Sequence, residues 1–122
     1  LSIVEKTIDM TPPVIKIKTS DNTFITKDGQ IDLNIDVTDN LDKQPQVRIE
    51  VFETDLKGRR KTDPKSAING RMSKEKTQLN TNIPNLTPKQ NNGKILPYFV
   101  RIEAFDSKGN STVETITVYS KP

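Results

Sequence analysis

The sequence contains no cysteine, no histidine and no tryptophan. Without cysteine there is no disulfide framework and no thiolate nucleophile, and without histidine a Cys/His zinc site and a Ser-His-Asp triad are excluded. Long apolar runs are also missing, because no stretch approaches the roughly 18 residues that a membrane span requires. These absences remove several common kinds of catalytic site, and we expect no contact with a membrane.

Apolar residues make up 31% of the 122 residues, which is a low share. Leu, Ile, Val and Phe still account for about a quarter of the chain, above the roughly 20% below which disorder is expected. A chain of this length matches one domain and buries about 65% of its unfolded surface on folding. We therefore expect a small core that needs no disulfide or metal.

The charges are of both signs and are spread along the chain. There are 19 Lys and Arg residues against 16 Asp and Glu residues, for a net charge of +3. Interspersed signs are typical of a solvated surface and not of a nucleic-acid footprint. We therefore predict that the chain has no nucleic-acid partner.

The first residues are interpreted as a junction. Pro12 and Pro13 fix φ and remove two backbone donors, so the chain around them is expected to be extended and stiff. We interpret residues 1–10 as a linker or as the tail of a preceding domain, and residues 11–122 as the folded domain. Any secretion signal or anchor is expected to lie outside these residues.

Alternation of apolar and polar residues is the main structural signal. Ile31, Leu33, Ile35 and Val37 are separated by polar residues, so a strand gathers them on one face whereas a helix would scatter them. The same reasoning predicts strands over residues 14–18, 31–38, 47–52, 98–105 and 112–119.

Turns and one irregularity complete the prediction. Asp28-Gly29 and the segment 106–110 carry turn chemistry. We expect a bulge in the last strand, because Val113, Ile116 and Val118 do not share one face. The segment 55–97 is not fully assigned. Within it we expect a strand over Gln78–Ile83, anchored by Leu79 and Ile83, and one helical turn over residues 71–76.

Short strands joined by turns, without a long helix, predict an all-β fold. The last two strands form a natural hairpin, and the earlier ones fit a Greek-key order. The expected architecture is an antiparallel β-sandwich of about seven strands.

Three segments carry a family resemblance. The pattern Asp-x-Thr-Pro-Pro-x-Ile at residues 9–15 resembles the opening of bacterial immunoglobulin-like and cadherin-like repeats. The segment Tyr98-Phe-Val-Arg-Ile-Glu-Ala-Phe-Asp-Ser-Lys-Gly-Asn is similar to their last hairpin, and Val37-Thr-Asp-Asn resembles the end of their second strand. The resemblance implies an immunoglobulin-like sandwich.

A fourth segment resembles another group of sandwich domains. Leu86-Thr87-Pro88 before Tyr98 resembles the corner of fibronectin type III domains, in which the tyrosine hydroxyl bonds back to the preceding loop. Here about six extra residues intervene. Such modules occur as stalk or accessory domains in Gram-positive adhesins and in cell-envelope subtilisin-like proteases. The resemblance implies an extracellular location, either cell wall-associated or secreted.

Carboxylate and amide residues form the first candidate site. In cadherin-like modules such oxygens from a linker and neighbouring loops hold calcium, which takes six to eight oxygen ligands. The alternative is turn chemistry, since Asp and Asn side chains bond to nearby backbone groups. The candidate ligands are Asp9, Asp39, Asn40, Asp42, Asp106 and Asn110.

Two further groups of charged residues are candidate sites. Lys57-Gly58-Arg59-Arg60-Lys61 is a basic cluster that either binds an anionic glycan, teichoic acid or nucleic acid, or is a solvated loop tip; flanking aromatics for base stacking are missing. Asp32 and Asp36 share a strand face, but the face is expected to be exposed, so nothing tunes a carboxylate for acid–base catalysis. We predict no catalytic residue.

The resulting expectation is a structural or spacer module of a larger bacterial cell-surface or secreted protein, with neighbouring domains of the same chain as its partners. The alternatives are an adhesive module that binds a host matrix protein or glycan, and an accessory domain of a cell-envelope subtilisin-like protease. No enzymatic activity and no cofactor other than calcium are expected of the domain itself.

Overall fold

A computed structural model describes residues 11–19, 23–26, 29–40, 45–55, 57, 59–71, 78–86, 89–91 and 93–120. Within these residues the chain forms ten strands and no helix. Residues 1–10, which we interpret as a linker or the tail of a preceding domain, lie outside the described part.

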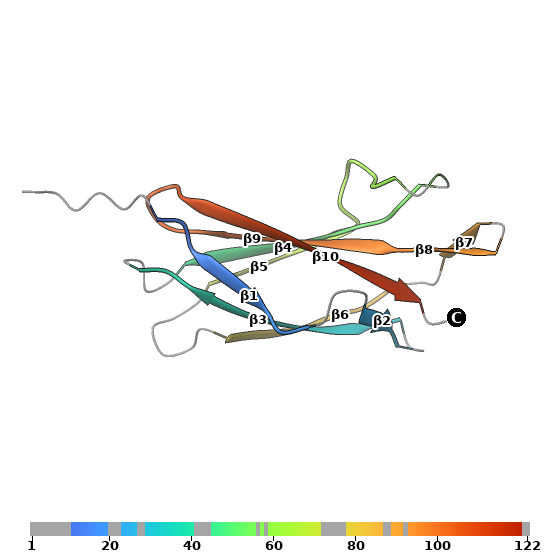
Figure 1. Cartoon of the computed structure of the whole chain (residues 1–122), viewed down its shortest axis with the longest axis horizontal. Coiled ribbons are helices and arrows are strands. Elements are labelled where there is room, and N and C mark those ends of the chain that lie inside the picture. Colours follow the sequence, from blue (N-terminus) through green and yellow to red (C-terminus); the bar gives the residue numbers. More distant parts are fainter. Residues whose placement is uncertain are drawn as a thin grey trace, which may run out of the picture.

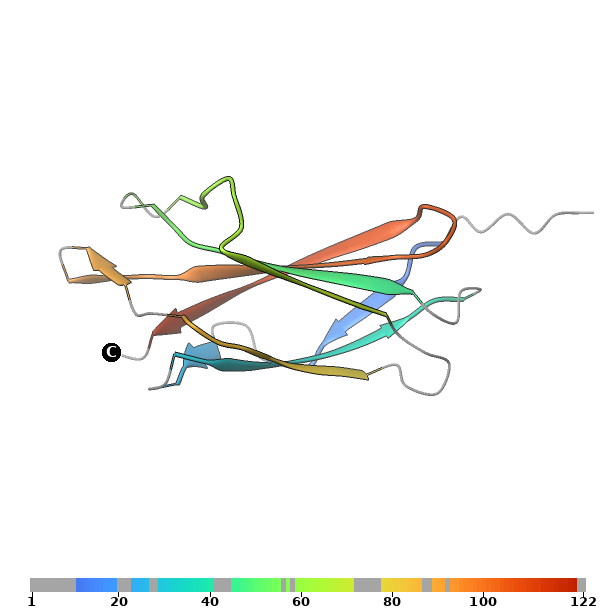
Figure 2. The same ribbon diagram turned by 180° about the vertical axis from the view of Figure 1, so that it is seen from behind.

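Eight of the strands form two sheets that face each other (Figures 1 and 2). One sheet has three strands in the order β1 (Val14–Ile17), β3 (Ile31–Thr38) and β6 (Gln78–Ile83). The other has five, in the order β2 (Thr23–Ile25), β10 (Ser111–Ser120), β9 (Tyr98–Phe105), β4 (Gln46–Phe52) and β5 (Ser66–Arg71). Seven of the eight pair antiparallel, and β2 runs parallel to β10.

The predicted all-β class is therefore confirmed, and the two facing sheets fit the predicted sandwich. A separate two-stranded hairpin, β7 (Lys89–Asn91) and β8 (Lys94–Leu96), follows β6 in the chain. It accounts for part of the extra chain length between Leu86 and Tyr98.

The core lies between the two sheets and is built from the alternating residues. Leu33 and Val37 of β3, and Val100 and Ile102 of β9, are completely buried. Tyr98 is the largest fully buried side chain and belongs to the same cluster. The burial of this apolar surface away from water makes the largest favourable contribution to the free energy that holds the two sheets together.

The prediction of a bulge in the last strand is wrong. Eight consecutive residues of β10 pair with β9, from Ser111 opposite Phe105 to Val118 opposite Tyr98, with no residue inserted. Val113 is instead on the outer face, opposite Glu103, and is 42% exposed. A regular ladder keeps every backbone bond, and a single exposed valine is tolerated on a protein surface.

The predicted strand Gln78–Ile83 is confirmed as β6, with Ile83 buried and Leu79 packed against the core. Before it, the chain forms β5, which ends at Arg71. That strand was not predicted. The other residues of the helical turn expected over 71–76 lie outside the described part.

The sandwich has two ends, which we call the N-terminal pole and the C-terminal pole. At the N-terminal pole, Val14 pairs with Thr38, and the Thr112 hydroxyl donates a hydrogen bond to the carbonyl oxygen of Pro13. At the C-terminal pole, Ser120 pairs with Ile25. The described chain therefore enters at one end and leaves at the other (Figure 1).

The outer face of the five-stranded sheet carries aromatic and charged residues. Phe52 pairs with Phe99 and is only 4% exposed, yet it is not part of the central cluster. The guanidinium of Arg60 covers its ring at 4.5 Å from the centroid. Further along this face, Arg101 donates to Glu50 at 2.9 Å. Phe52 is thus buried by the following loop and not by the opposite sheet.

Candidate functional site

Four of the six candidate calcium ligands lie within the described residues, and all four are at the N-terminal pole. Asp39 and Asn40 follow the end of β3, and Asp106 and Asn110 belong to the turn between β9 and β10. The strand pairing brings these segments to one end, because Gln46 at the start of β4 lies opposite Phe105 at the end of β9.

The two remaining candidates, Asp9 and Asp42, lie outside the described residues. The strand order thus answers a question that the sequence leaves open, namely whether the loops meet at one pole or at two. Both described pairs are at the same pole.

The carboxylate of Asp106 organises its own turn. One oxygen, Oδ1, accepts the backbone N–H groups of Lys108 at 2.9 Å and of Asn110 at 3.0 Å, and Oδ2 accepts the Asn110 side-chain amide at 2.9 Å. Gly109 in the same turn has a φ of +90°. Asp106 is 5% exposed. These contacts are the turn chemistry that was the alternative interpretation of this residue.

The calcium site remains a prediction. The part of the chain that the structure describes contains no group of three or more Asp, Glu, His or Cys side chains placed to hold a metal ion. Both Asp106 oxygens already accept hydrogen bonds, and a carboxylate offers about four lone-pair sites.

We expect Asp106→Ala to lower the free energy of unfolding by about 2 kcal/mol, because the backbone N–H groups of Lys108 and Asn110 lose a charged acceptor. Chemical denaturation measures this loss, with Lys108→Ala in the same turn as the control, whose exposed side chain should matter little. Melting with and without millimolar calcium tests the metal role separately. Stabilisation by calcium that disappears in Asp106→Ala would establish it, whereas an unchanged stability of this variant without calcium would contradict the turn role.

The basic cluster lies at the other end of the molecule, in the connection between β4 and β5. We call residues 53–65 the basic loop. Its two arms are held together like a small hairpin: Thr54 and Arg60 form an isolated antiparallel bridge, and the N–H of Lys61 donates to the carbonyl oxygen of Glu53 at 2.9 Å. The Thr54 hydroxyl donates to the Pro97 carbonyl oxygen at 3.1 Å. Because Thr54 is buried, it fixes the loop to the body of the domain.

Asp55 orders the tip of the basic loop. Its Oδ1 accepts the backbone N–H groups of Lys57 and Arg59, each at 2.9 Å, and its Oδ2 accepts the Arg59 Nε at 3.1 Å. The hydrogen bond from the Arg59 backbone is the main cause that holds the pKa of the Asp55 carboxyl below its usual value, and the Arg59 guanidinium acts in the same direction.

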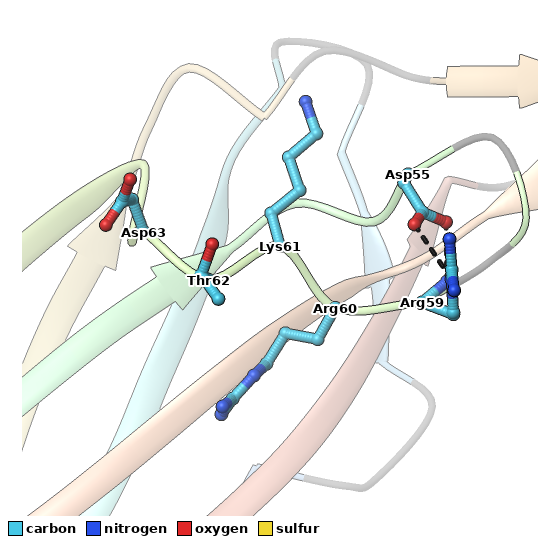
Figure 3. Close-up of a pocket in the computed structure, with 6 residues that line it drawn as sticks. All are labelled: Asp55, Arg59, Arg60, Lys61, Thr62 and Asp63. Carbon is cyan, nitrogen blue, oxygen red and sulfur yellow. Dashed lines mark hydrogen bonds and ion pairs between the residues drawn. The ribbon is translucent and has the colours of Figure 1, made fainter.

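An open hollow of about 510 Å³ lies on the basic loop (Figure 3). The close-up shows that the side chains leave the loop in different directions, with Lys61 pointing away from Arg60. The hollow is lined by Asp55, Arg59, Arg60, Lys61, Thr62 and Asp63. The Arg59 side chain is 71% exposed and that of Lys61 is 51% exposed.

The carboxylates of Asp32 and Asp36 lie on the outer face of the three-stranded sheet, away from the core. Asp32 is exposed and accepts a hydrogen bond from the Asn82 side-chain amide at 3.0 Å, while Asp36 is half-buried. The prediction of a solvent-exposed face therefore holds for Asp32 but is wrong for Asp36, because the Oδ1 atom of Asp36 is buried.

Two features of the basic loop were missed by sequence reasoning, namely the anchor of Thr54 and the stacking of Arg60 on Phe52. The available signal is the sequence position of Phe52, which alternates with Val47, Ile49 and Val51 and so falls on the polar side of its strand. The partner of Phe52 is eight positions away across a loop, and no local periodicity connects the two.

No family model, no curated protein and no solved structure matches this chain. In the described part of the chain, no helix is long and apolar enough to cross a membrane.

Proposed function

We propose that the domain is a non-catalytic spacer module of the immunoglobulin-like type, which positions neighbouring domains of a larger bacterial surface or secreted protein. The observation that carries the proposal is the position of the two ends of the described chain. Pro13 is at the N-terminal pole and Ser120 is at the C-terminal pole. Eight residue steps along β10, from Thr112 to Ser120, separate the two poles, a rise of about 27 Å.

The sheet order supports the immunoglobulin-like type. The neighbours β10, β9 and β4 reproduce the G-F-C order of such folds, and β3 with β6 corresponds to strands B and E of the other sheet. Leu86 and Tyr98, which carry the resemblance to the corner of fibronectin type III domains, are both fully buried in the core. The hydrogen bond of the Tyr98 hydroxyl within this corner is a prediction.

The strand directions suit a module that is pulled from its two ends. Tension on the N-terminal side loads β1 along its length against β3, and tension on the C-terminal side loads β10 against its parallel neighbour β2. In this shear geometry, several backbone hydrogen bonds must break together. A spacer of this kind transmits force and keeps its length until the whole domain unfolds.

Single-molecule pulling tests the proposal. The chain is held between two marker domains fused to its ends. We expect one cooperative unfolding event that lengthens the chain by about 350 Å, because residues 11–120 extend to about 3.4 Å each and about 27 Å is already spanned.

A second attachment geometry is the control. Because the chain has no cysteine, Lys108→Cys gives a single attachment point at the N-terminal pole. Pulling between this site and the N-terminal end peels strands apart one bond at a time and should need less force. Unfolding in several small steps, or at the same force in both geometries, would argue against a load-bearing spacer.

A further inference from the structure

The basic loop has a net positive charge. It contains five cations, Lys57, Arg59, Arg60, Lys61 and Lys65, against three carboxylates, Glu53, Asp55 and Asp63. Its excess of two charges compares with a net charge of +3 for all 122 residues. A patch of this kind creates a local positive potential that attracts anions.

The cations of this loop are not equivalent. The Arg59 side chain is paired with Asp55 and that of Lys61 with Glu53, the second at 3.4 Å. Arg60 is exposed and forms no ion pair with any described residue. Its guanidinium is instead held over the Phe52 ring. Stacking on a ring face orders an arginine but leaves its N–H donors at the edge of the plane available.

The loop is also pre-organised for binding. Three kinds of contact hold the described residues of the loop in place in the free molecule: the bridge between Thr54 and Arg60, the backbone contacts made by Asp55, and the bond from Thr54 to Pro97. Little conformational entropy is therefore lost when a ligand contacts the arginine side chains, and this loss is one of the main costs of binding.

The directions of the side chains indicate the shape of the ligand. Arg60 and Lys61 project to different sides of the loop (Figure 3). A site for one small anion would require the donors to converge on one point, whereas these are spread around an open hollow. A linear chain with several separated negative groups can reach more than one of them at once.

We propose that the basic loop binds a linear anionic polysaccharide, with the Arg60 guanidinium as its central contact and with Arg59 and Lys61 at its flanks. Guanidinium groups pair with sulfate, carboxylate or phosphate through two parallel hydrogen bonds. Single-stranded nucleic acid fits this surface less well, because it is bound through exposed aromatic rings, and the ring beneath Arg60 is 4% exposed.

The experiment measures binding of the whole chain to heparin, which carries sulfate groups, and to polygalacturonate, which carries carboxylates, at low and at physiological salt. We expect binding that weakens as salt rises. Arg60→Gln should lower the affinity at least about fivefold, Arg59→Gln with Arg60→Gln by more than tenfold, and Arg60→Lys by an intermediate factor, because lysine keeps the charge but loses the planar fork.

Lys108→Gln at the opposite pole is the matched control, since it removes the same charge from another exposed site and should change the affinity less than about twofold. Equal losses in Lys108→Gln and Arg60→Gln would overturn the proposal, as would wild-type affinity in the double variant. Tighter binding of a single-stranded oligonucleotide than of either polysaccharide would also overturn it. Melting curves of each variant show whether the fold is retained. The result of the pulling experiment does not depend on anion binding by the basic loop, so each of the two proposals can fail alone.

Discussion

Replacing Tyr98 by alanine should lower the free energy of unfolding by about 3–5 kcal/mol. Tyr98 is 1% exposed, is the largest fully buried side chain and belongs to the cluster that joins the two sheets. Its removal leaves a cavity between the sheets in addition to the lost burial of the ring. Since domains are stable by only about 5–15 kcal/mol, we expect this change to remove a large part of the stability.

Phe99 provides the matched control, because it is the next residue of the same strand and its side chain lies on the outer face, where it is half-buried. Phe99→Ala should lower the free energy of unfolding by only about 1–2 kcal/mol. The half-buried Phe99 ring contributes less buried surface than the Tyr98 ring does, and its removal leaves no internal cavity. Urea denaturation of both variants measures the difference. An equal or larger loss for Phe99→Ala would contradict the assignment of the inner and outer faces of β9.

Tyr98→Phe in the same series tests the predicted corner. A hydrogen-bonded hydroxyl should contribute about 1 kcal/mol to the free energy of unfolding, and Tyr98→Phe removes that contribution.

The two sheet faces of β3 and β9 were predicted correctly because these strands are half-buried along their whole length. In β3 the residues Ile31, Leu33, Ile35 and Val37 are all buried, as their spacing predicts. Alternation reports burial on one face of a strand, and these two strands lie in the interior of their sheets with a neighbour on each side. In these two strands, the local sequence pattern is therefore enough to predict which side chains are buried.

The edge of the five-stranded sheet could not be predicted in the same way. In β5, Ser66, Ala67 and Asn69 are exposed, and Ile68 is only half-buried. With little burial there is no alternation to detect, and the strand exists because β4 offers it a partner. The short strand β2 likewise depends on its pairing with the end of β10, about 95 residues further along the chain. Such long-range pairing has no local sequence signature.

The candidate sites show a related limit. The acidic residues of the turns were recognised, but an aspartate that closes a turn and one that binds calcium are the same residue type in the same setting. The hydrogen bonds that Asp106 accepts from Lys108 and Asn110 assign it a turn role. For the basic loop, the sequence shows the charges, whereas the position of Arg60 over Phe52 distinguishes one cation from its neighbours.

The second large effect is expected for Gly29→Ala, which should lower the free energy of unfolding by about 2–3 kcal/mol. Gly29 has a φ of +74°, a conformation that costs other residues about 1–2 kcal/mol. In addition, a Cβ at this position would lie 3.1 Å from the carbonyl oxygen of Leu86. The obstacle is backbone and is held in place, because the Leu86 N–H donates to the carbonyl oxygen of Gly29 at 2.8 Å. Relief of the contact would therefore strain the hydrogen bond that joins the two loops.

Gly93→Ala separates the two contributions. Gly93 has nearly the same backbone conformation, with a φ of +78°, but no atom lies within 4 Å of the position that its Cβ would occupy. Gly93→Ala should therefore lower the free energy of unfolding only by the cost of the backbone conformation, about 1 kcal/mol. Denaturant titrations of the two variants give the contact energy as their difference. If Gly29→Ala were no worse than Gly93→Ala, the close approach of the two loops would not contribute to stability, and Gly29 would be required only for its backbone conformation.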